Sequence, residues 1–395
     1  MDEEDDEVEE LSADPEALEM DTPAERSGHI AVVDRNIMYV WGGYKNAQNH
    51  GFFDLYLPRS EIWTYDMESG VMKHIAGGNL CTSMSGSCGV CLDGVLYLFG
   101  GHHARGNTNR IYHMHLRARS LVWEEMRDLK GLPPSSKDKL GCWVHNNRLV
   151  FFGGYGCAPQ GAHRGTFEYD ESSSLWDSMG RGWNNHIHVL DLETSTWSQP
   201  ITQGNTPSPR AAHACATVGN RGYVFGGRFK NYRLNDLYYI DLDTWDWHEM
   251  LPGPVGRSWH SFTPVSSDLI FLFGGFTTER ETLSDAWLYC VSKNEWKPFK
   301  HSHTESPRLW HTACSGPDGE VFVFGGCANN LLSHQIAAHS NELLIFNVQP
   351  KSLVRFCMET ALQHRERLSC YWDCLPKHLL HSLKQRMSGV NTLGS

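Results

Sequence analysis

At six places in the chain a glycine doublet closes a short apolar run such as MYVW, LYLF or VFVF. Successive doublets are 58, 53, 73, 48 and 51 residues apart. A repeat of about 50 residues is typical of a β-propeller, because one unit cannot bury its own faces and must pack against its neighbours. The doublets are Gly42-Gly43, Gly100-Gly101, Gly153-Gly154, Gly226-Gly227, Gly274-Gly275 and Gly325-Gly326.

A second motif precedes every doublet by 14 to 17 residues, for example RSGH before the first and RAAH before the fourth. Short turns between motif and doublet (DRN, DG, NNR, GNRG) indicate a β-hairpin, and further strand patterns follow. Four strands per repeat predict an all-β fold, a six-bladed β-propeller over residues 22–350. The sequence does not indicate which strand closes the ring. The third repeat also carries a long insertion, from Tyr155 to Asn185, of a length that is more often functional than decorative.

The acidic charge of the chain is concentrated at its start. Residues 1–21 contain twelve Asp and Glu and no Lys or Arg, which leaves 34 acidic and 34 basic residues elsewhere. The balanced body argues against nucleic acid as a partner, and we expect residues 1–21 to be disordered. No stretch is apolar for the roughly 18 residues that a membrane span needs, and no secretion signal is recognised. We therefore expect a soluble intracellular protein with reduced thiols and no membrane partner.

The sequence offers little for catalysis. It contains no G-x-S-x-G, H-E-x-x-H or phosphate-loop motif. Cys88 and Cys91 form a lone CxxC in an apolar run, which indicates strand residues rather than a zinc site. His102 and His103 are adjacent but lack further ligands, so we expect no metal and no cofactor. Four other histidines share one repeat column and are interpreted as structural: His29, His213, His260 and His311.

After Pro350 the pattern changes from period two to the period of 3.6 that is typical of an α-helix. A second helix is expected from Pro376, a favourable first-turn residue. Residues 351–386 are therefore predicted to form a helical appendage, and residues 387–395 a flexible tail. The apolar stripe of the first helix consists of Leu353, Cys357 and Ala361, and that of the second of Leu379, Leu380 and Leu383.

The repeats can be aligned on their doublets, so that equivalent positions form rings around one axis. Departures from a column are the better functional candidates. The residue after the doublet is a cation only at Arg228, and Arg233 follows in the same loop. Two guanidinium groups in one loop predict a site for a small anion, to which Ser258 could add a hydroxyl donor. The aromatic residues that could wall this site are Tyr44, Tyr155, Trp183, Trp259 and Trp310.

The first residue of the upstream motif forms another column. Its repeated arginine is interpreted as structural, bonding neighbouring blades. Two structural interpretations stay open. Asp236 and other rim carboxylates could simply pair with Arg228 and Arg233, and Trp259 could merely fill space between blades. From the residues alone, an anion site and a structural ion pair are about equally supported. The column reads Arg26, Met84, Lys139, Arg210, Arg257 and Arg308.

The doublets, their spacing and the tandem Tyr/Trp signals resemble the kelch family over residues 22–350. The motifs RGWNNH, RAAHACATVGNRGYVFGGR, PVGRSWHS and RLWHTAC look like those of a kelch-family substrate receptor of cullin-2 RING ubiquitin ligases. This resemblance implies recognition of proteins by a C-terminal diglycine. The implied carboxylate-binding trio is Arg228, Arg233 and Ser258, and the other implied pocket positions are Lys139, Tyr155, Trp183 and Trp259.

The tail carries two further resemblances: SLVRFCMETA is similar to an elongin-C-binding box, and LPKHLLHSL to a cullin-2 box. The implied protein is non-catalytic, holding substrates ending in Gly-Gly beside elongin B, elongin C, cullin-2 and its RING subunit, in nucleus and cytoplasm, for ubiquitination and proteasomal degradation. The alternative is a generic kelch scaffold that binds folded partners through its loops. The implied elongin C contacts are Leu353, Cys357 and Ala361, and the implied cullin-2 contacts are Leu375, Pro376, Leu379 and Leu383.

A carboxylate at a C-terminus occurs once per chain, so a buried arginine pair would select chain ends. Glycine at the last positions lets backbone enter where a side chain would clash. The chain itself ends in Leu393-Gly394-Ser395, with small residues where the implied ligand has two glycines. We therefore expect that Gly394-Ser395 could occupy the pocket of another copy, giving self-association.

Overall fold

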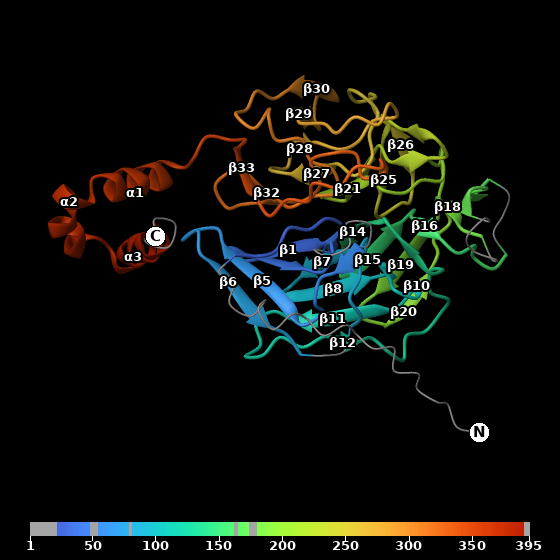
Figure 1. Ribbon diagram of the computed structural model, residues 1–395, viewed down its shortest axis with the longest axis horizontal. Coiled ribbons are helices and arrows are strands. Elements are labelled where there is room, and N and C mark those ends of the chain that lie inside the picture. Colours follow the sequence, from blue (N-terminus) through green and yellow to red (C-terminus); the bar gives the residue numbers. More distant parts are fainter. Residues whose placement is uncertain (1–21, 48–53, 79–80, 162–164, 174–179, 391–395) are drawn as a thin grey trace.

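The computed structural model describes residues 22–47, 54–78, 81–161, 165–173 and 180–390. Five sheets of four antiparallel strands and one of three surround the centre of the body, which confirms the six-bladed propeller (Figure 1). The predictions for residues 1–21 and 391–395 lie outside the described residues. All twelve cysteines are free, and no helix in the described ranges is long and apolar enough to cross a membrane.

The strands of each blade follow one another in the chain. Blades one to three consist of β1 (Ile30–Asp34), β2 (Ile37–Trp41), β5 (Glu61–Asp66) and β6 (Met72–Ala76); β7 (Cys88–Leu92), β8 (Val95–Phe99), β11 (Ile111–His115) and β12 (Glu124–Glu125); and β14 (Gly141–His145), β15 (Arg148–Phe152), β19 (Ile187–Asp191) and β20 (Thr196–Ser198). Blades four to six consist of β21 (Ala214–Val218), β22 (Arg221–Phe225), β25 (Leu237–Asp241) and β26 (Trp247–Glu249); β27 (Ser261–Pro264), β28 (Leu269–Phe273), β29 (Ala286–Cys290) and β30 (Glu295–Pro298); and β31 (Thr312–Ser315), β32 (Glu320–Phe324) and β33 (Leu343–Asn347).

The hydrophobic core lies between blades. In blades three to six the apolar run that ends in a doublet is buried on both faces, because blades cover it from either side. In blades one and two Tyr39 and Tyr97 are only partly buried. One buried cluster joins each pair of neighbours, for example Trp41 of blade one with Trp123 of blade two, whose ring centroids are 5.2 Å apart. Met38 of blade one packs with Phe322 of blade six in the same way, so the ring closes by packing of blade one against blade six.

Backbone hydrogen bonds close the ring around its axis. One residue per blade donates its N–H to the carbonyl of the equivalent residue in the preceding blade, at 2.8 to 3.1 Å, and blade one donates to blade six. All six residues have positive φ, which turns both their N–H and C=O groups along the ring. This axial ring consists of Gly28, Gly86, Lys139, Ala212, Trp259 and Trp310.

The axial ring corrects the alignment of the third repeat. Lys139 was predicted to open its motif, but it occupies the third place, equivalent to Ala212. Lys137 takes the first place, since its carbonyl accepts from Gly101 as that of Met84 accepts from Gly43. The sequence KLGC imitates RSGH by placing a glycine third, and only the hydrogen-bond register separates the two alignments.

The repeated arginine is structural, as predicted, although its side chain binds within its own blade. Arg210 donates to Asp236 at 2.6 Å and Arg257 to Asp285 at 2.7 Å. The backbone carbonyls of these arginines, together with the histidine column, connect the blades: Nε2 of His213 lies 3.0 Å from the carbonyl of Phe152. The remaining pairs are Arg26 with Glu61, and Arg308 with Glu342.

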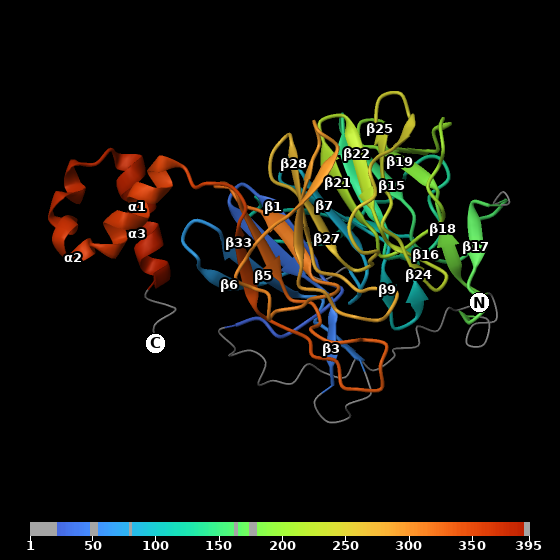
Figure 2. The same ribbon diagram turned by 90° about the horizontal axis from the view of Figure 1, so that it is seen from above.

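Small hairpins follow the doublets at one end of the propeller. Figure 2 places β3, β9 and β24 on the same edge of the body. In blade three the predicted insertion forms a second sheet, in the order β13-β16-β18-β17. These strands are β3 (Tyr44–Asn46), β4 (Asp54–Tyr56), β9 (His102–His103), β10 (Gly106–Asn107), β13 (Lys137–Asp138), β16 (Tyr155–Gly156), β17 (Phe167–Tyr169), β18 (Gly182–Asn184), β23 (Arg228–Phe229) and β24 (Tyr232–Arg233).

The helical segment stands beside the propeller (Figure 1). It consists of α1 (Leu353–Gln363), α2 (Arg365–Leu368), the 3₁₀-helix η3 (Ser369–Cys374) and α3 (Lys377–Val390). The predicted second helix thus begins one residue after Pro376 and extends to Val390, beyond the predicted end at residue 386. The helices bury their own small core around Met358, Trp372 and Leu383.

Candidate functional site: a cationic aromatic pocket on the propeller axis

The hairpin β23–β24 holds the two predicted arginines opposite one another. Arg228 and Arg233 are cross-strand partners, separated by a turn that contains Lys230 at a φ of 54°. The Arg228 backbone N–H donates to the carbonyl of Ala211 at 2.7 Å, and its Nε donates to the carbonyl of Lys230 at 2.8 Å. The hairpin therefore concentrates two positive charges beside the axial ring.

Arg233 is buried without an anionic partner. Its side chain is only 8% exposed, its Nε has no hydrogen-bond partner in the described part of the chain, and neither Arg233 nor Arg228 forms an ion pair there. Burial, together with the charges of Arg228 and Arg280, lowers the pKa of Arg233 to about 10, so it stays protonated at neutral pH. A buried, unpaired charge is costly, and such a site favours an incoming anion.

The bland alternative for this pair is wrong. Asp236 binds Arg210 through both carboxylate oxygens, at 2.6 and 2.9 Å. The carboxylate that reaches Arg228 electrostatically is Asp170, in the blade-three insertion, and its oxygens already accept hydrogen bonds from Tyr155 and Ser172. In the described part of the chain Arg228 and Arg233 thus remain without a paired carboxylate.

Ser258 and Arg233 both contact Phe276. It exchanges backbone hydrogen bonds with Phe276, at 3.0 and 2.8 Å. The guanidinium of Arg233 lies 5.1 Å from the centre of the Phe276 ring, in a cation–π arrangement. Phe276, which sequence reasoning did not select, therefore joins the predicted serine to the predicted arginines.

Aromatic rings complete a circuit around the axis. Trp259 stacks on Trp310 at 5.2 Å, and Trp310 lies 5.6 Å from Tyr44. On the other side Tyr155 meets Trp183 at 5.5 Å, and Trp183 lies 5.7 Å from the guanidinium of Arg228. These contacts bring every predicted wall residue into one cluster.

Lys139 closes this circuit. Its Nζ lies 5.2 Å from the Tyr155 ring and 5.8 Å from that of Trp310, and it pairs with the buried carboxylate of Asp138 at 3.0 Å. Tyr155 donates to Asp170 at 2.9 Å, and burial, reinforced by that carboxylate, raises the pKa of Tyr155 to about 12. The phenol therefore remains a neutral donor. The residues predicted for this cluster bring together three cations, the hydroxyl of Ser258 and five aromatic rings.

Sequence reasoning missed three residues that complete the cluster: Phe276, Arg181 and Asp170. Phe276 shares a column with Arg228 and could have been found there. Arg181, whose guanidinium lies 5.1 Å from the Tyr155 ring, comes from the insertion, where no repeat alignment applies. Asp170, from the same insertion, positions Tyr155.

Two hollows lie next to the cluster and beside blade three, and neither is lined by Arg228, Arg233 or Ser258. A cavity of about 150 Å³ on the axis is lined by Lys139, Trp259 and Trp310 together with the histidine column. A groove of about 870 Å³ lies beside blade three, and its lining includes no Lys, Arg, Asp or Glu from the described ranges. No group of three or more metal-ligating side chains occurs in those ranges. His102 instead contacts the Tyr56 hydroxyl at 2.8 Å.

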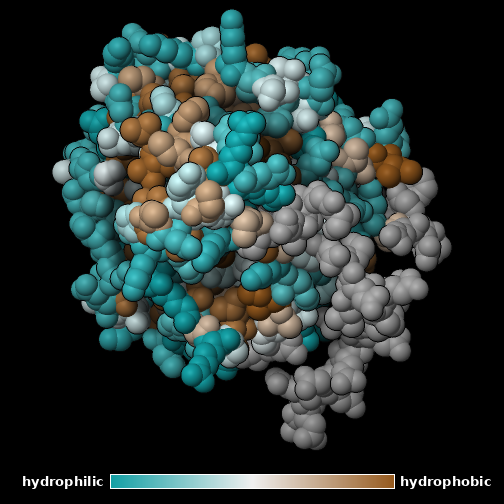
Figure 3. All heavy atoms as spheres, turned by 90° about the vertical axis from the view of Figure 1, so that its left-hand side faces the viewer, coloured by the Kyte–Doolittle hydropathy of each residue, from teal (hydrophilic) through white to brown (hydrophobic). Residues whose placement is uncertain are grey.

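The helical segment exposes part of its predicted contact surface. Leu353 and Cys357 are exposed on α1, next to Phe356, while Ala361 is half-buried against the helical core. Figure 3, which faces this end of the molecule, shows hydrophobic side chains exposed among hydrophilic ones. On the second element Pro376 is exposed, whereas Leu375 and Leu379 are partly buried. Leu383 is only 2% exposed, so its prediction as a contact residue is wrong: it packs inside the helical core.

Fold and cluster together define a propeller of the kelch type that carries a cationic, aromatic cluster at its axis. The chain belongs to the kelch-repeat family: the KLHDC2/KLHL20/DRC7 Kelch-repeats domain matches residues 7–179 and 58–252, and the Attractin/LZTR1 beta-propeller matches residues 177–356. Kelch propellers are generally non-catalytic.

Among named relatives, the chain is 62% identical to Kelch domain-containing protein 2 of Bos taurus and of Homo sapiens, covering 96% of this chain and 95% of theirs. It is 44% identical to Kelch domain-containing protein 1 of Homo sapiens, over 92% of this chain and 90% of that one. The solved structure titled "Structure of YjhT" shares the fold, with a TM-score of 0.60 at 16% identity over 82% of this chain and 96% of that chain. The resemblance seen in the loop motifs is thus confirmed at the level of the family and of these relatives.

Proposed function

We propose that this protein is the substrate-recognition subunit of a cullin-2 RING ubiquitin ligase, which captures proteins that end in Gly-Gly. The observation that carries the proposal is the pair Arg228 and Arg233, of which Arg233 is buried, charged and unpaired among the described residues. An arginine pair with one buried and one half-buried member and no resident carboxylate suits a ligand that brings its own, and a polypeptide C-terminus is such a ligand.

The chemistry of the pocket suits a chain end. Each charged hydrogen bond to the carboxylate contributes about 1.5 to 3 kcal/mol when it is desolvated, and Ser258 supplies a neutral donor beside the arginines. Trp183 and Trp259, both packed in the circuit of rings, leave glycine as the residue that enters without a clash. Selectivity then comes from steric exclusion as much as from attraction.

The helical segment supplies the second half of the proposal. Leu353, Phe356 and Cys357 form an exposed apolar face on α1, which suits elongin C, and Leu375 and Pro376 begin the element that would meet cullin-2. The receptor itself breaks no bond. It raises the effective concentration of substrate beside a ubiquitin-charged enzyme held elsewhere on the cullin.

This role can be tested by purifying the protein from nuclear and cytoplasmic fractions of cells and identifying the proteins that co-purify with it. We expect the wild-type chain to retain elongin B, elongin C and cullin-2, and Leu353→Asp to lose them while still binding a Gly-Gly peptide. Arg365→Ala, an exposed change in the same segment, is the control and should retain all three. A chain that retains none of them in its wild-type form behaves as the generic kelch scaffold instead.

The chain's own end gives a second, smaller test. Gly394-Ser395 lies outside the described residues, and under this proposal it competes for the pocket of another copy. Adding a bulky residue after Ser395 should lower the oligomer mass measured by light scattering and raise the affinity for a Gly-Gly peptide. Unchanged mass and affinity would exclude self-association through this end.

A further inference from the structure

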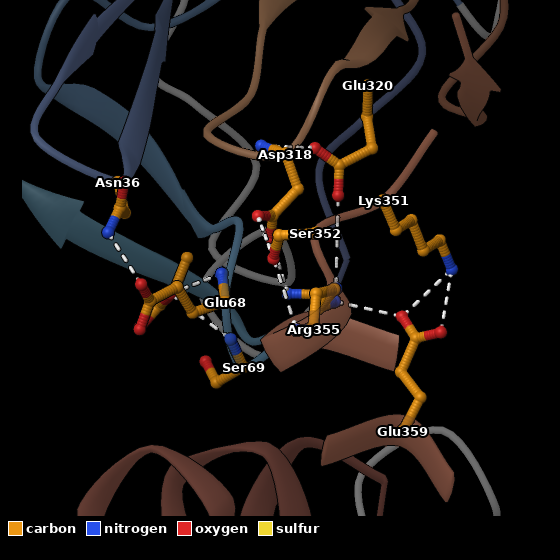
Figure 4. Close-up of polar contacts among 10 residues, drawn as sticks. Asn36, Glu68, Ser69, Asp318, Glu320, Lys351, Ser352, Arg355 and Glu359 are labelled. Atoms are coloured by element: carbon orange, nitrogen blue, oxygen red, sulfur yellow. Dashed lines mark hydrogen bonds and ion pairs between the residues drawn. The ribbon is translucent and has the colours of Figure 1, made fainter. Parts of the chain in front are cut away.

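The helical segment and the propeller have separate hydrophobic cores. The helical core consists of Met358, Trp372 and Leu383 with partly buried neighbours from the same segment, and it includes no propeller side chain from the described ranges. Ion pairs and a hydrogen bond from charged and polar side chains join α1 to blade six (Figure 4). The orientation of the helices relative to the propeller therefore depends on a few charged and polar groups rather than on a shared core.

Arg355 is the centre of this junction. In Figure 4 its side chain points from α1 toward the turn between β31 and β32. Its Nη1 lies 3.5 Å from Oδ2 of Asp318, its Nη2 lies 3.9 Å from Oε1 of Glu320, and its Nε donates to Glu359 at 2.9 Å. One guanidinium thus connects two carboxylates of blade six with one of its own helix.

The junction is largely shielded from solvent. The Arg355 side chain is 14% exposed and that of Glu320 is 4% exposed. Burial alone would raise the pKa of Glu359, but the hydrogen bonds from Lys351 and Arg355 outweigh it and lower that pKa. Charge pairs at this depth are weakly screened, so the contact resists salt better than a surface pair would.

The start of α1 is fixed at the same point. Ser352 caps the helix by accepting from the Arg355 backbone N–H at 3.2 Å, and its hydroxyl lies 3.4 Å from Asp318. Asp318 therefore contacts both the cap and the first turn of α1. This arrangement sets the direction in which the helix leaves the propeller.

Arg355 faces away from the exposed apolar side of α1. At 3.6 residues per turn it lies roughly 200° around the helix from Leu353, whereas Cys357 lies roughly 40° from it. Leu353 and Phe356 are 77% and 62% exposed, while Arg355 is turned toward blade six. Within SLVRFCMETA, Arg355 is thus engaged by the propeller and is separate from the face offered to a partner.

We propose that Arg355 is a positioning residue. By joining α1 to Asp318 and Glu320, it fixes the angle between the partner-binding helices and the pocket proposed for the Gly-Gly chain end. The functional consequence rests on the proposed ligase role, since a fixed angle would hold a captured protein at a defined place relative to the ubiquitin-charged enzyme. Loss of Arg355 leaves pocket and helical surface intact but lets the angle vary.

A distance measurement tests the joint independently of ligase function. Cys157, in the blade-three insertion, and Cys374, in η3, are exposed, and Cys357→Ser with Cys370→Ser leaves these two as the exposed thiols. Spin labels on Cys157 and Cys374 should give one narrow distance distribution in the otherwise wild-type chain. Arg355→Ala should broaden it several-fold, Arg365→Ala should not, and the exchange Arg355→Asp with Asp318→Arg should narrow it again. An equally narrow distribution in Arg355→Ala overturns the proposal.

A second readout links the joint to transfer. With a Gly-Gly reporter that carries several lysines, Arg355→Ala should bind the peptide and co-purify with elongins B and C as the wild type does. The modified lysines, mapped by mass spectrometry, should spread over more positions. If the wild type fails to hold elongins, the ligase role fails while the distance result still decides the joint. A broadened distribution with an unchanged lysine pattern removes the functional consequence.

Discussion

This propeller contains two sets of arginines, which differ in whether a carboxylate of the fold pairs with them. Arg210 and Arg257 belong to the frame: each is fully buried, and each meets a carboxylate of its own blade at 2.6 and 2.7 Å. Arg228 and Arg233 belong to the pocket, and in the described part of the chain neither meets a carboxylate. The frame arginines are paired within the fold, whereas we propose that the pocket pair is paired by an anionic ligand.

This difference shows that burial alone does not assign a role to an arginine. A satisfied buried pair holds the fold together, and removing one partner strands the other. A buried arginine without a paired carboxylate weakens the fold slightly, and a bound anion would remove that cost. The predictions below separate these two behaviours.

The largest expected effect is on the frame. Arg257→Ala removes two hydrogen bonds to Asp285 and one to the carbonyl of Gly274, and leaves Asp285 with Trp287 as its partner. It should lower the free energy of unfolding by about 3 kcal/mol, measured by urea denaturation. Arg233→Ala is the matched pocket variant, and it should change that free energy by less than about 1 kcal/mol, because no internal ion pair is broken. Equal losses in the two variants would erase the distinction between frame and pocket.

The histidine column makes the frame sensitive to acid. Burial, with further contributions from nearby charges, lowers the pKa of His213 and of His311 to about 3. An unfolded histidine titrates near 6.5, so between pH 6.5 and 3 the unfolded chain binds more protons. Each such histidine should therefore remove about 1.4 kcal/mol of stability per pH unit as the pH falls.

Urea denaturation at several pH values checks this slope. His213→Gln should make it shallower by the contribution of one proton, and His334→Gln, at an exposed position, should leave it unchanged. If both variants keep the wild-type slope, His213 does not carry the acid sensitivity.

The smallest expected effect concerns the axial ring that both regions share. Ala212 has a φ of 55°, a conformation in which glycine avoids a steric cost. Ala212→Gly should therefore leave stability unchanged or raise it by up to about 1 kcal/mol. Its neighbour Ala211 is buried and lies outside the positive-φ set, so Ala211→Gly should destabilise by about 1 kcal/mol. Thermal unfolding measures the stability change of both variants. Destabilisation by both to the same extent would contradict the positive-φ conformation of Ala212 in the axial ring.

Much of the fold could be predicted from the sequence, because the propeller repeats recur at a recognisable spacing. The doublets place the strands, and Arg228 stands out as a departure from its column. The register of blade three was wrong because Gly141 imitates the glycine of the other motifs. Leu383 was misassigned because an amphipathic stripe does not tell whether a helix faces its own core or a partner.

Other parts of the site could not be predicted in physical terms. The insertion has no equivalent in other blades, so Asp170 and Arg181 had no column from which to depart. Whether Asp236 would pair with Arg210 or with Arg228 depended on distances of a few ångströms between loops. Only the folded structure decides between them.

The most direct measurement compares a peptide ending in Gly-Gly with its C-terminally amidated form. The wild type should prefer the free carboxylate by at least about 100-fold, since two or more charged hydrogen bonds depend on it. Arg228→Ala and Arg233→Ala should each weaken binding of the free peptide and leave the amide almost unaffected, and Arg105→Ala, at an exposed rim position, should behave as the wild type. Equal affinity of the wild type for both peptides would contradict carboxylate capture by this pocket.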